Sequence, residues 1–143
     1  MPRVLIADVP EASVVLSACL EKETAVVTAE SLEDALAEVR RGVDLVITGV
    51  HFADSQMLDL VRTIKSDPAL RHLPLICVRL IGAERGPAVL SRLRPVLSSL
   101  EAVEFVDLIG LIQAIGAEEA FSEFRQRIRS RLAATRRTGP AVS

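Results

Sequence analysis

The heptapeptide Asp44-Leu45-Val46-Ile47-Thr48-Gly49-Val50 decides the fold class of this chain. An unbroken run of Leu, Val, Ile and Thr, opened by an acid and closed by a glycine, is typical of a strand buried on both faces of a parallel sheet. In open α/β sheets, ligands and chemistry are found beyond the carboxyl ends of such strands. Position 49 therefore lies where function is expected, and a glycine there offers no nucleophile, metal ligand or proton.

Other apolar runs predict strands on both sides of this one. They lie at residues 4–7, 25–28, 74–78 and 103–106. Helical periodicity separates the runs: Asp8 is expected to cap a first helix, and Ser31 a second helix that ends at Gly42. Five strands alternating with five helices predict a three-layer α/β/α sandwich, a doubly wound five-stranded parallel sheet with helices on both faces.

The helical segments carry apolar stripes that are the expected core faces. In the first helix the expected stripe is Val14, Val15, Ala18 and Cys19, with Leu16 as a further candidate. In a single last helix it is Phe121, Phe124, Ile128 and Leu132. We expect one domain over residues 1–132 and a flexible basic tail over residues 133–143.

Composition narrows the class of protein. Half of the 143 residues are hydrophobic, 25% are charged, and the net charge is −2. No segment approaches the roughly 18 consecutive apolar residues of a membrane span. The two cysteines, Cys19 and Cys77, lie in apolar patterns typical of reduced, buried thiols. We therefore expect a cytoplasmic protein that does not associate with membranes.

Four phrases of the sequence resemble, in order and spacing, the receiver domain of response regulators (the CheY-like family). They are VLIAD at 4–8, VVTAESLEDALAEV at 26–39, DLVITGV at 44–50 and LDLVRTIKSDPALRHLPLICV at 58–78. The resemblance implies a flavodoxin-like sheet with a phosphorylation pocket at the strand ends. Family members place two adjacent acids after the first strand to hold magnesium, and an acceptor Asp after the third. A Ser or Thr follows the fourth strand and a Lys-Pro pair the fifth, so that the cation, hydroxyl and ammonium share the charge of the transferring phosphoryl group.

This chain departs from the family pattern at four of those five positions. The first acid is present, and the positions in order fall on Asp8, Val9, Gly49, Arg79 and Leu108. Asp8 cannot hold magnesium alone. The resemblance therefore implies a degenerate receiver with no catalytic residue, no metal and no cofactor.

Four residues around the emptied pocket need their own interpretation. Asp8 either only caps the first helix while Arg79 points into solvent, or it pairs with an Arg79 guanidinium that takes the place of the absent metal. Thr48 cannot replace the acceptor, because alternation along the strand turns it to the opposite face. Phe105 matches the aromatic switch position of the family, and we expect it to be fixed packing because Arg79 replaces its hydroxyl-bearing partner.

The segment from Arg79 to Leu108 is longer than in the family and is broken by Pro95, which suggests a rebuilt surface. In the family, the fourth helix, fifth strand and fifth helix form the face that binds partners. The candidate contacts on that face are Arg92, Arg94, Leu97, Arg125 and Arg129. We expect a protein partner, or a second copy of the chain, to bind there. The predicted function is that of a phosphorylation-independent pseudo-receiver, an interaction module in bacterial two-component and phosphorelay signalling.

Other functions remain as alternatives. The main one is a sensor domain that binds a small anion or metabolite in the emptied pocket at the strand ends. Nucleic-acid binding ranks last, because the arginines at 125–131 alternate at spacing two and no stacking aromatic residues interleave with them. No Ser/His/Asp or Cys/His arrangement is visible, so we do not expect an enzyme.

Overall fold

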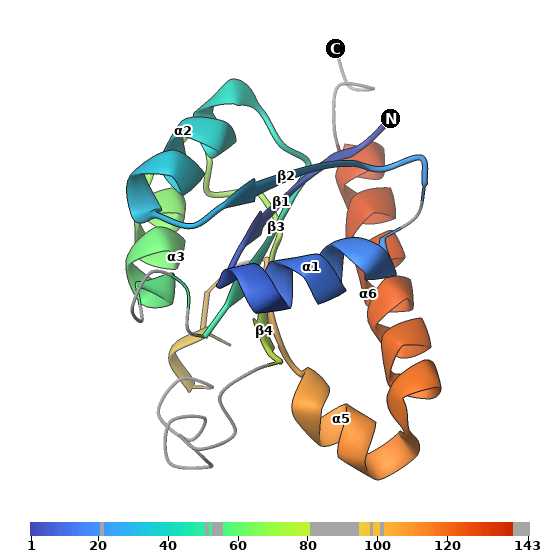
Figure 1. Cartoon of the computed structure of the whole chain (residues 1–143). Helices are drawn as coiled ribbons and strands as arrows, with labels where there is room; N and C mark the ends of the chain where they lie inside the picture. The colour runs from blue at the N-terminus through green and yellow to red at the C-terminus, as the bar shows by residue number, and fades with distance from the viewer. Residues whose placement is uncertain are drawn as a thin grey trace.

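The computed structural model describes residues 1–20, 22–50, 52, 56–80, 95–97, 99–100 and 102–138, with side chains up to residue 134 in the last helix. Five parallel strands form one sheet in the order β2-β1-β3-β4-β5 (Figure 1). They are β1 (Arg3–Ala7), β2 (Ala25–Ala29), β3 (Leu45–Gly49), β4 (Leu75–Arg79) and β5 (Val103–Asp107). This is the doubly wound, flavodoxin-like sheet expected from the sequence, with β3 at its centre.

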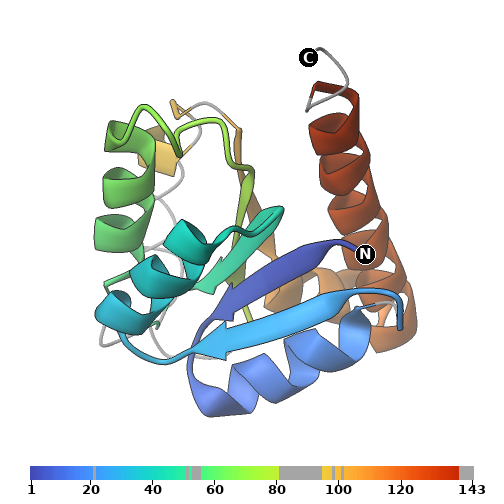
Figure 2. The same cartoon turned by 90° about the horizontal axis from the view of Figure 1, so that it is seen from above.

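Helices cover both faces of the sheet and complete three layers (Figures 1 and 2). One face carries α1 (Pro10–Cys19), α5 (Leu108–Ile115) and α6 (Ala117–Thr138). The other carries α2 (Leu32–Arg41) and α3 (Met57–Ser66). No helix in the described part of the chain is long and apolar enough to cross a membrane.

Alternation along the strands divides the core into two clusters. On β3, Leu45 and Ile47 face α1 and α6, whereas Val46 faces α2 and α3. All five residues of β3 are buried. The apolar run that decides the fold is therefore buried from both sides, as parallel sheets require.

The cap expected for α2 is correct, and the cap expected for α1 is wrong. Ser31 caps α2, since its Oγ accepts a hydrogen bond from the Asp34 amide at 3.1 Å, and Gly42 ends that helix with a φ of 110°. Asp8 does not cap α1: the cap residue is Val9, no side chain bonds the first turn, and Pro10 opens the helix. The fixed φ of proline starts this helix without a side-chain cap.

The apolar face of α1 is the expected one only at Leu16 and Cys19. Ala12, Leu16 and Cys19, at i, i+4 and i+7, are buried against the sheet. Val14 is 72% exposed and Val15 37% exposed, because both lie away from that row. Two large apolar side chains of α1 are therefore left at the surface.

The single last helix of the prediction is two helices. Gly116, with a φ of 88°, separates α5 from α6 in a backbone conformation that favours glycine. Phe124 and Ile128 of α6 are buried as expected. The helix continues to Thr138, so the predicted tail from residue 133 is helical that far, and residues 139–143 lie outside the described part.

Candidate functional site

The carboxyl ends of the strands bring four of the sequence-predicted positions to one edge of the sheet. Ala7 pairs with Thr48, Gly49 with Val78, and Arg79 with Asp107. Asp8, Gly49, Arg79 and Leu108 consequently all lie at or just beyond this edge. The edge is the place of the phosphorylation pocket that the resemblance implied, and its chemistry depends on where these side chains point.

The carboxyl group of Asp8 lies directly over Gly49. Asp8 is only 4% exposed, and its Oδ1 accepts a hydrogen bond from the Val9 amide at 2.7 Å. A Cβ atom built on Gly49 would lie 1.9 Å from Asp8 Oδ2 and 2.0 Å from Asp8 Cγ, far inside van der Waals contact. The space in which a side chain at position 49 would begin is therefore filled by Asp8.

Burial changes the acidity of this carboxyl group. Loss of hydration raises the pKa of Asp8 from 3.8 to about 6, against the hydrogen bond from Val9, which lowers it, and with a smaller rise from the charge of Glu11. No hydrogen bond in the described part of the chain joins Asp8 to a basic side chain. The group is therefore neutralised by a proton as the pH falls through about 6.

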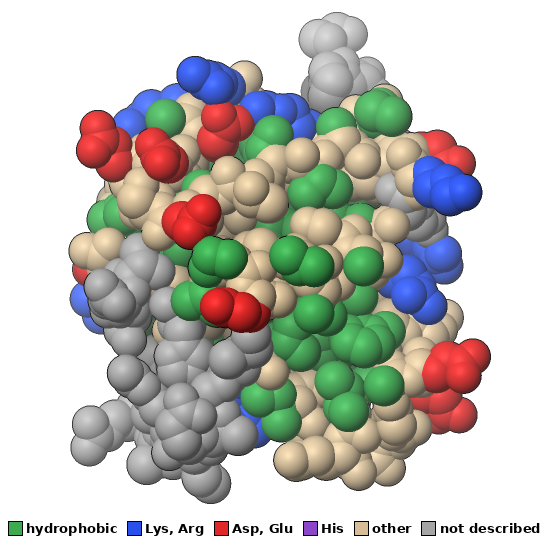
Figure 3. Space-filling view, viewed as in Figure 1, with side chains coloured by type: hydrophobic (Ala, Val, Ile, Leu, Met, Phe, Trp, Pro, Cys, Tyr) green, Lys and Arg blue, Asp and Glu red, His purple; other side chains and the backbone are tan. Residues whose placement is uncertain are grey.

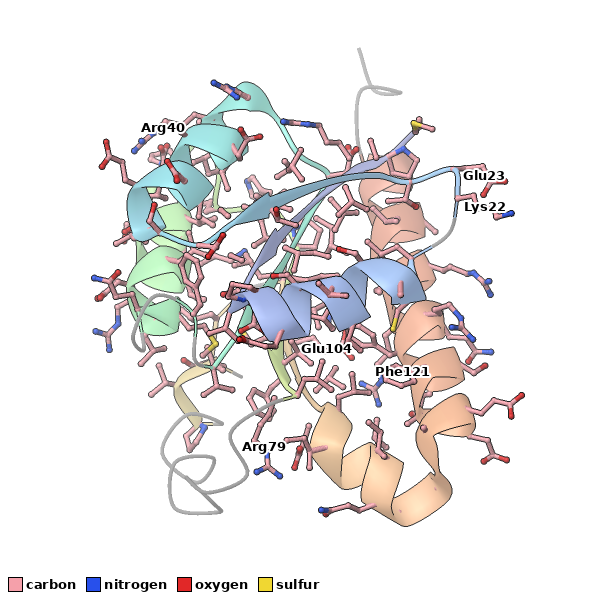
Figure 4. The ribbon with its side chains drawn as sticks, viewed as in Figure 1. Lys22, Glu23, Arg40, Arg79, Glu104 and Phe121 are labelled. Atoms are coloured by element: carbon pink, nitrogen blue, oxygen red, sulfur yellow. The ribbon has the colours of Figure 1, made fainter. Side chains whose placement is uncertain are left out.

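Arg79 pairs with Asp107, not with Asp8. Its Nε donates to Asp107 Oδ1 at 2.9 Å and its Nη2 to Oδ2 at 3.1 Å, a bidentate pair between neighbouring strands. Figure 4 shows Arg79 at the end of β4. Both interpretations made from the sequence are wrong: β4 lies two strands from β1, and the Arg79 side chain, 14% exposed, does not point freely into solvent.

Asp107 is the residue of this edge that the sequence reasoning missed. Besides holding Arg79, its Oδ1 accepts a hydrogen bond from the Gly110 amide at 3.0 Å and so caps α5. Asp107 follows a predicted strand and precedes the Gly110 amide by three residues, which is the spacing of a helix cap. This spacing was the signal available in the sequence. One carboxylate thus fixes both the fourth strand's arginine and the start of α5.

The remaining pocket positions belong to the core. Leu108, at the lysine position, is fully buried in the cluster that contains Phe124. Phe105 is half-buried and packs against the cluster under α2 and α3. Thr48 is fully buried, and its hydroxyl has no hydrogen-bond partner among the described residues, so it is not accessible to a phosphoryl donor.

These residues do not fit a magnesium site. Magnesium needs ionised oxygen ligands in a near-octahedral shell. Asp8 is a single buried carboxyl group with a raised pKa, and Val9 stands where a second acid would be. Asp107 is held by Arg79. The described residues of this edge therefore lack the ligand set of a magnesium site.

Three of the predicted interaction residues, Leu97, Arg125 and Arg129, lie in the described part of the chain. Leu97 is 1% exposed and packs in the core, so it is wrong as a surface contact. Arg92 and Arg94 lie outside the described residues. Arg125 and Arg129 line a cavity beside the end of α1.

The arginines between them on α6 point elsewhere. Arg127 and Arg131 contact the carboxylate of Glu104 on β5, the latter through Nε to Oε1 at 3.0 Å. The alternating arginines are thus divided between two sides of α6, as their spacing of two predicts.

Two solved structures show what the fold resembles. One is described as the phosphorylated cyanobacterial phytochrome response regulator RcpA, with a TM-score of 0.61 and 15% identity over 87% of this chain and 89% of that chain. The other is a sensor protein from Polaromonas sp. JS666, with a TM-score of 0.56 and 22% identity over 85% of this chain and 97% of that chain. No family model matches the sequence, and no curated protein does. The likeness establishes a receiver-like fold.

Gly49→Ala is expected to destabilise the protein, because the added methyl group must displace the buried Asp8 carboxyl group. Gly49 has no positive φ, so backbone strain does not contribute. Overpacking costs about 1–3 kcal/mol, and urea unfolding should show a loss of that size in the free energy of unfolding.

The control for this substitution is a double-mutant cycle. Asp8→Ala removes the group that clashes, so the added cost of Gly49→Ala should fall by about 1 kcal/mol or more in the Asp8→Ala background. If the two substitutions are additive instead, Asp8 does not lie over Gly49.

Proposed function

We propose that this chain is a receiver-like domain that acts without phosphorylation, as a protein-interaction module in two-component-type signalling. The fold is similar to that of a response regulator and of a sensor protein, which supports a signalling role at the level of fold. The observation that carries the proposal is the placement of the Asp8 carboxyl group in the space beside Gly49.

Phosphoryl transfer to a side chain needs a nucleophile, a cation that shares the developing charge, and room for the donor. At this edge a glycine occupies the position of the nucleophile. Leu108 occupies the position of the cationic side chain and is buried. The Arg79 guanidinium at this edge is held by Asp107. An anionic donor approaching Gly49 would meet the carboxyl group of Asp8. These placements support a domain that keeps one conformation and binds partners through its outer faces.

The exposed apolar side chains suggest where a partner binds. Val14 and Val15 on α1 and Ile115 on α5, exposed by 72%, 37% and 41%, form what we term the α1–α5 surface. Both helices cover the same face of the sheet, and Figure 3 shows hydrophobic side chains gathered over α1 and between α1 and the lower helices. In α5 only Leu108 is buried, although the helix is almost entirely apolar. Apolar patches of this kind mark interaction sites.

The ligand-sensing alternative at the emptied pocket has less support. A small anion at the strand ends needs a free positive charge, and Arg79 is committed to Asp107. The space next to Gly49 is occupied by a carboxyl group. The same two observations that support a phosphorylation-independent role therefore count against an anion site at this edge.

Treatment with acetyl phosphate and magnesium is expected to leave the intact mass of the chain unchanged. The physical reason is the missing nucleophile at Gly49 and the carboxyl group that fills its place. A receiver domain with an acceptor Asp, treated in parallel, provides the positive control by gaining the mass of one phosphoryl group. A stable adduct of that mass mapped to an Asp of this chain would overturn the proposal.

Val14→Glu is expected to abolish partner binding while leaving the fold intact, because a charge enters an exposed apolar surface. The measurement is capture of host proteins on the immobilised chain, quantified by mass spectrometry. Thr63→Glu is the matched control, since Thr63 is exposed on α3, on the opposite face of the sheet.

The expected pattern is a protein set captured by the parent chain and by Thr63→Glu, and lost with Val14→Glu. Acetyl phosphate should not change the set. Equal capture by both variants would rule out the α1–α5 surface, and capture that depends on the phosphodonor would rule out phosphorylation independence.

A further inference from the structure

A cavity of about 620 Å³ opens at the amino-terminal edge of the sheet, at the opposite end from the candidate site. Its lining includes Pro2, just before β1, and Thr24, just before β2. The end of α1 and one side of α6 form its walls. The volume falls within the range of about 300–1,000 Å³ that small-molecule sites occupy.

The floor of this cavity is apolar. Cys19 and Ile128 are 5% and 4% exposed and belong to the core cluster on this face. Leu20 and Leu132 are half-buried and pack against the same cluster. An apolar body can therefore leave water on this floor, with a gain of about 25 cal/mol for each Å² buried.

The polar groups of the cavity are mainly cationic. Arg125 and Arg129, one helical turn apart on α6, both line it, and Glu23 is the acidic residue of the lining. Figure 3 shows Lys and Arg side chains gathered on the flank of the molecule beside the end of α1, and Figure 4 shows Glu23 on the loop between α1 and β2, directed outward. Among the described residues of the lining there are thus two guanidinium groups and one carboxylate.

The charges of α6 are distributed over two sides of the helix. Glu104 on β5 contacts Arg127 and Arg131, which line a different hollow. Burial raises the pKa of the Cys19 thiol, and the charge of Arg125 partly opposes that rise. The Arg125 guanidinium therefore acts electrostatically on a residue of the apolar floor.

We propose that this cavity binds a small amphipathic carboxylate. The aliphatic or aromatic body lies on the floor between Leu20 and Leu132, and the carboxylate pairs with Arg125 and Arg129. Guanidinium groups bind carboxylates through two parallel hydrogen bonds, which gives both affinity and orientation. A cationic head group is repelled, and a neutral one forgoes the charge-assisted bonds. The site is independent of the proposed signalling role, because it shares no residue with the edge around Gly49.

Octanoate is the probe, and isothermal titration calorimetry measures its binding to the full chain. We expect one saturable site, with affinity that rises from butanoate through hexanoate to octanoate as more apolar surface is buried. Octan-1-ol, which has the same body and no charge, should show no saturable binding. Arg125→Met keeps the apolar stem and removes the charge, and should weaken octanoate binding by about tenfold.

Two variants separate a site from a general charge effect. Arg40→Met makes the same substitution at an exposed position on α2, across the sheet, and should keep the affinity of the parent chain (Figure 4). Ala133→Phe, at an exposed position of the cavity lining, fills the space without changing any charge and should abolish binding. Thermal melts that match the parent chain show that each variant is folded.

The proposal is overturned if octanoate does not saturate, if octan-1-ol binds as tightly, or if Arg40→Met weakens binding as much as Arg125→Met. These outcomes leave the result of the phosphodonor experiment untouched. A mass adduct at an Asp would in turn leave the carboxylate site standing, so the two proposals fail separately.

Discussion

The contact between the Asp8 carboxyl group and the backbone at Gly49 is the constraint on which the carboxyl edge of this sheet depends. Because Asp8 folds over the end of β3, position 49 has no room for a side chain. Burial raises the pKa of Asp8 to about 6, so a proton neutralises the group below that pH. At the same edge Leu108 lies in the core, and Arg79 pairs with its neighbour on β5.

The Arg79–Asp107 pair links this edge to the helices that follow. Asp107 caps α5 while it holds Arg79, so α5 begins directly after β5. The short apolar α5 ends at Gly116, and α6 then returns along the sheet and buries Phe124 and Ile128. This path leaves apolar side chains at the surface on α1 and α5 and places two arginines of α6 over the cavity at the amino edge. The candidate binding features are therefore on the outer faces and at that cavity.

The sequence predicts the strands and their layers because each rests on a local pattern of apolar runs and spacing. It does not predict the direction of the Asp8 side chain. That direction depends on the absence of a side chain at position 49 of β3. It also leaves the rotation of α1 undetermined, because Val14 and Leu16 are equally apolar and only packing on the sheet selects Leu16. Two signals were readable: Gly116 as the glycine that ends a helix, and Asp107 as the neighbour of Arg79 at the ends of adjacent strands.

A site-specific NMR titration of the Asp8 carboxyl carbon, with and without magnesium, tests the central claim most directly. We predict a pKa of about 6 that magnesium does not move. Since the folded-state pKa lies above the unfolded value of 3.8, the stability that this group contributes is complete below about pH 3.8 and is lost as the pH rises through about 6. A pKa at or below 3.8 that magnesium lowers further would contradict the claim, because it would show an ionised carboxylate open to solvent and able to bind the metal.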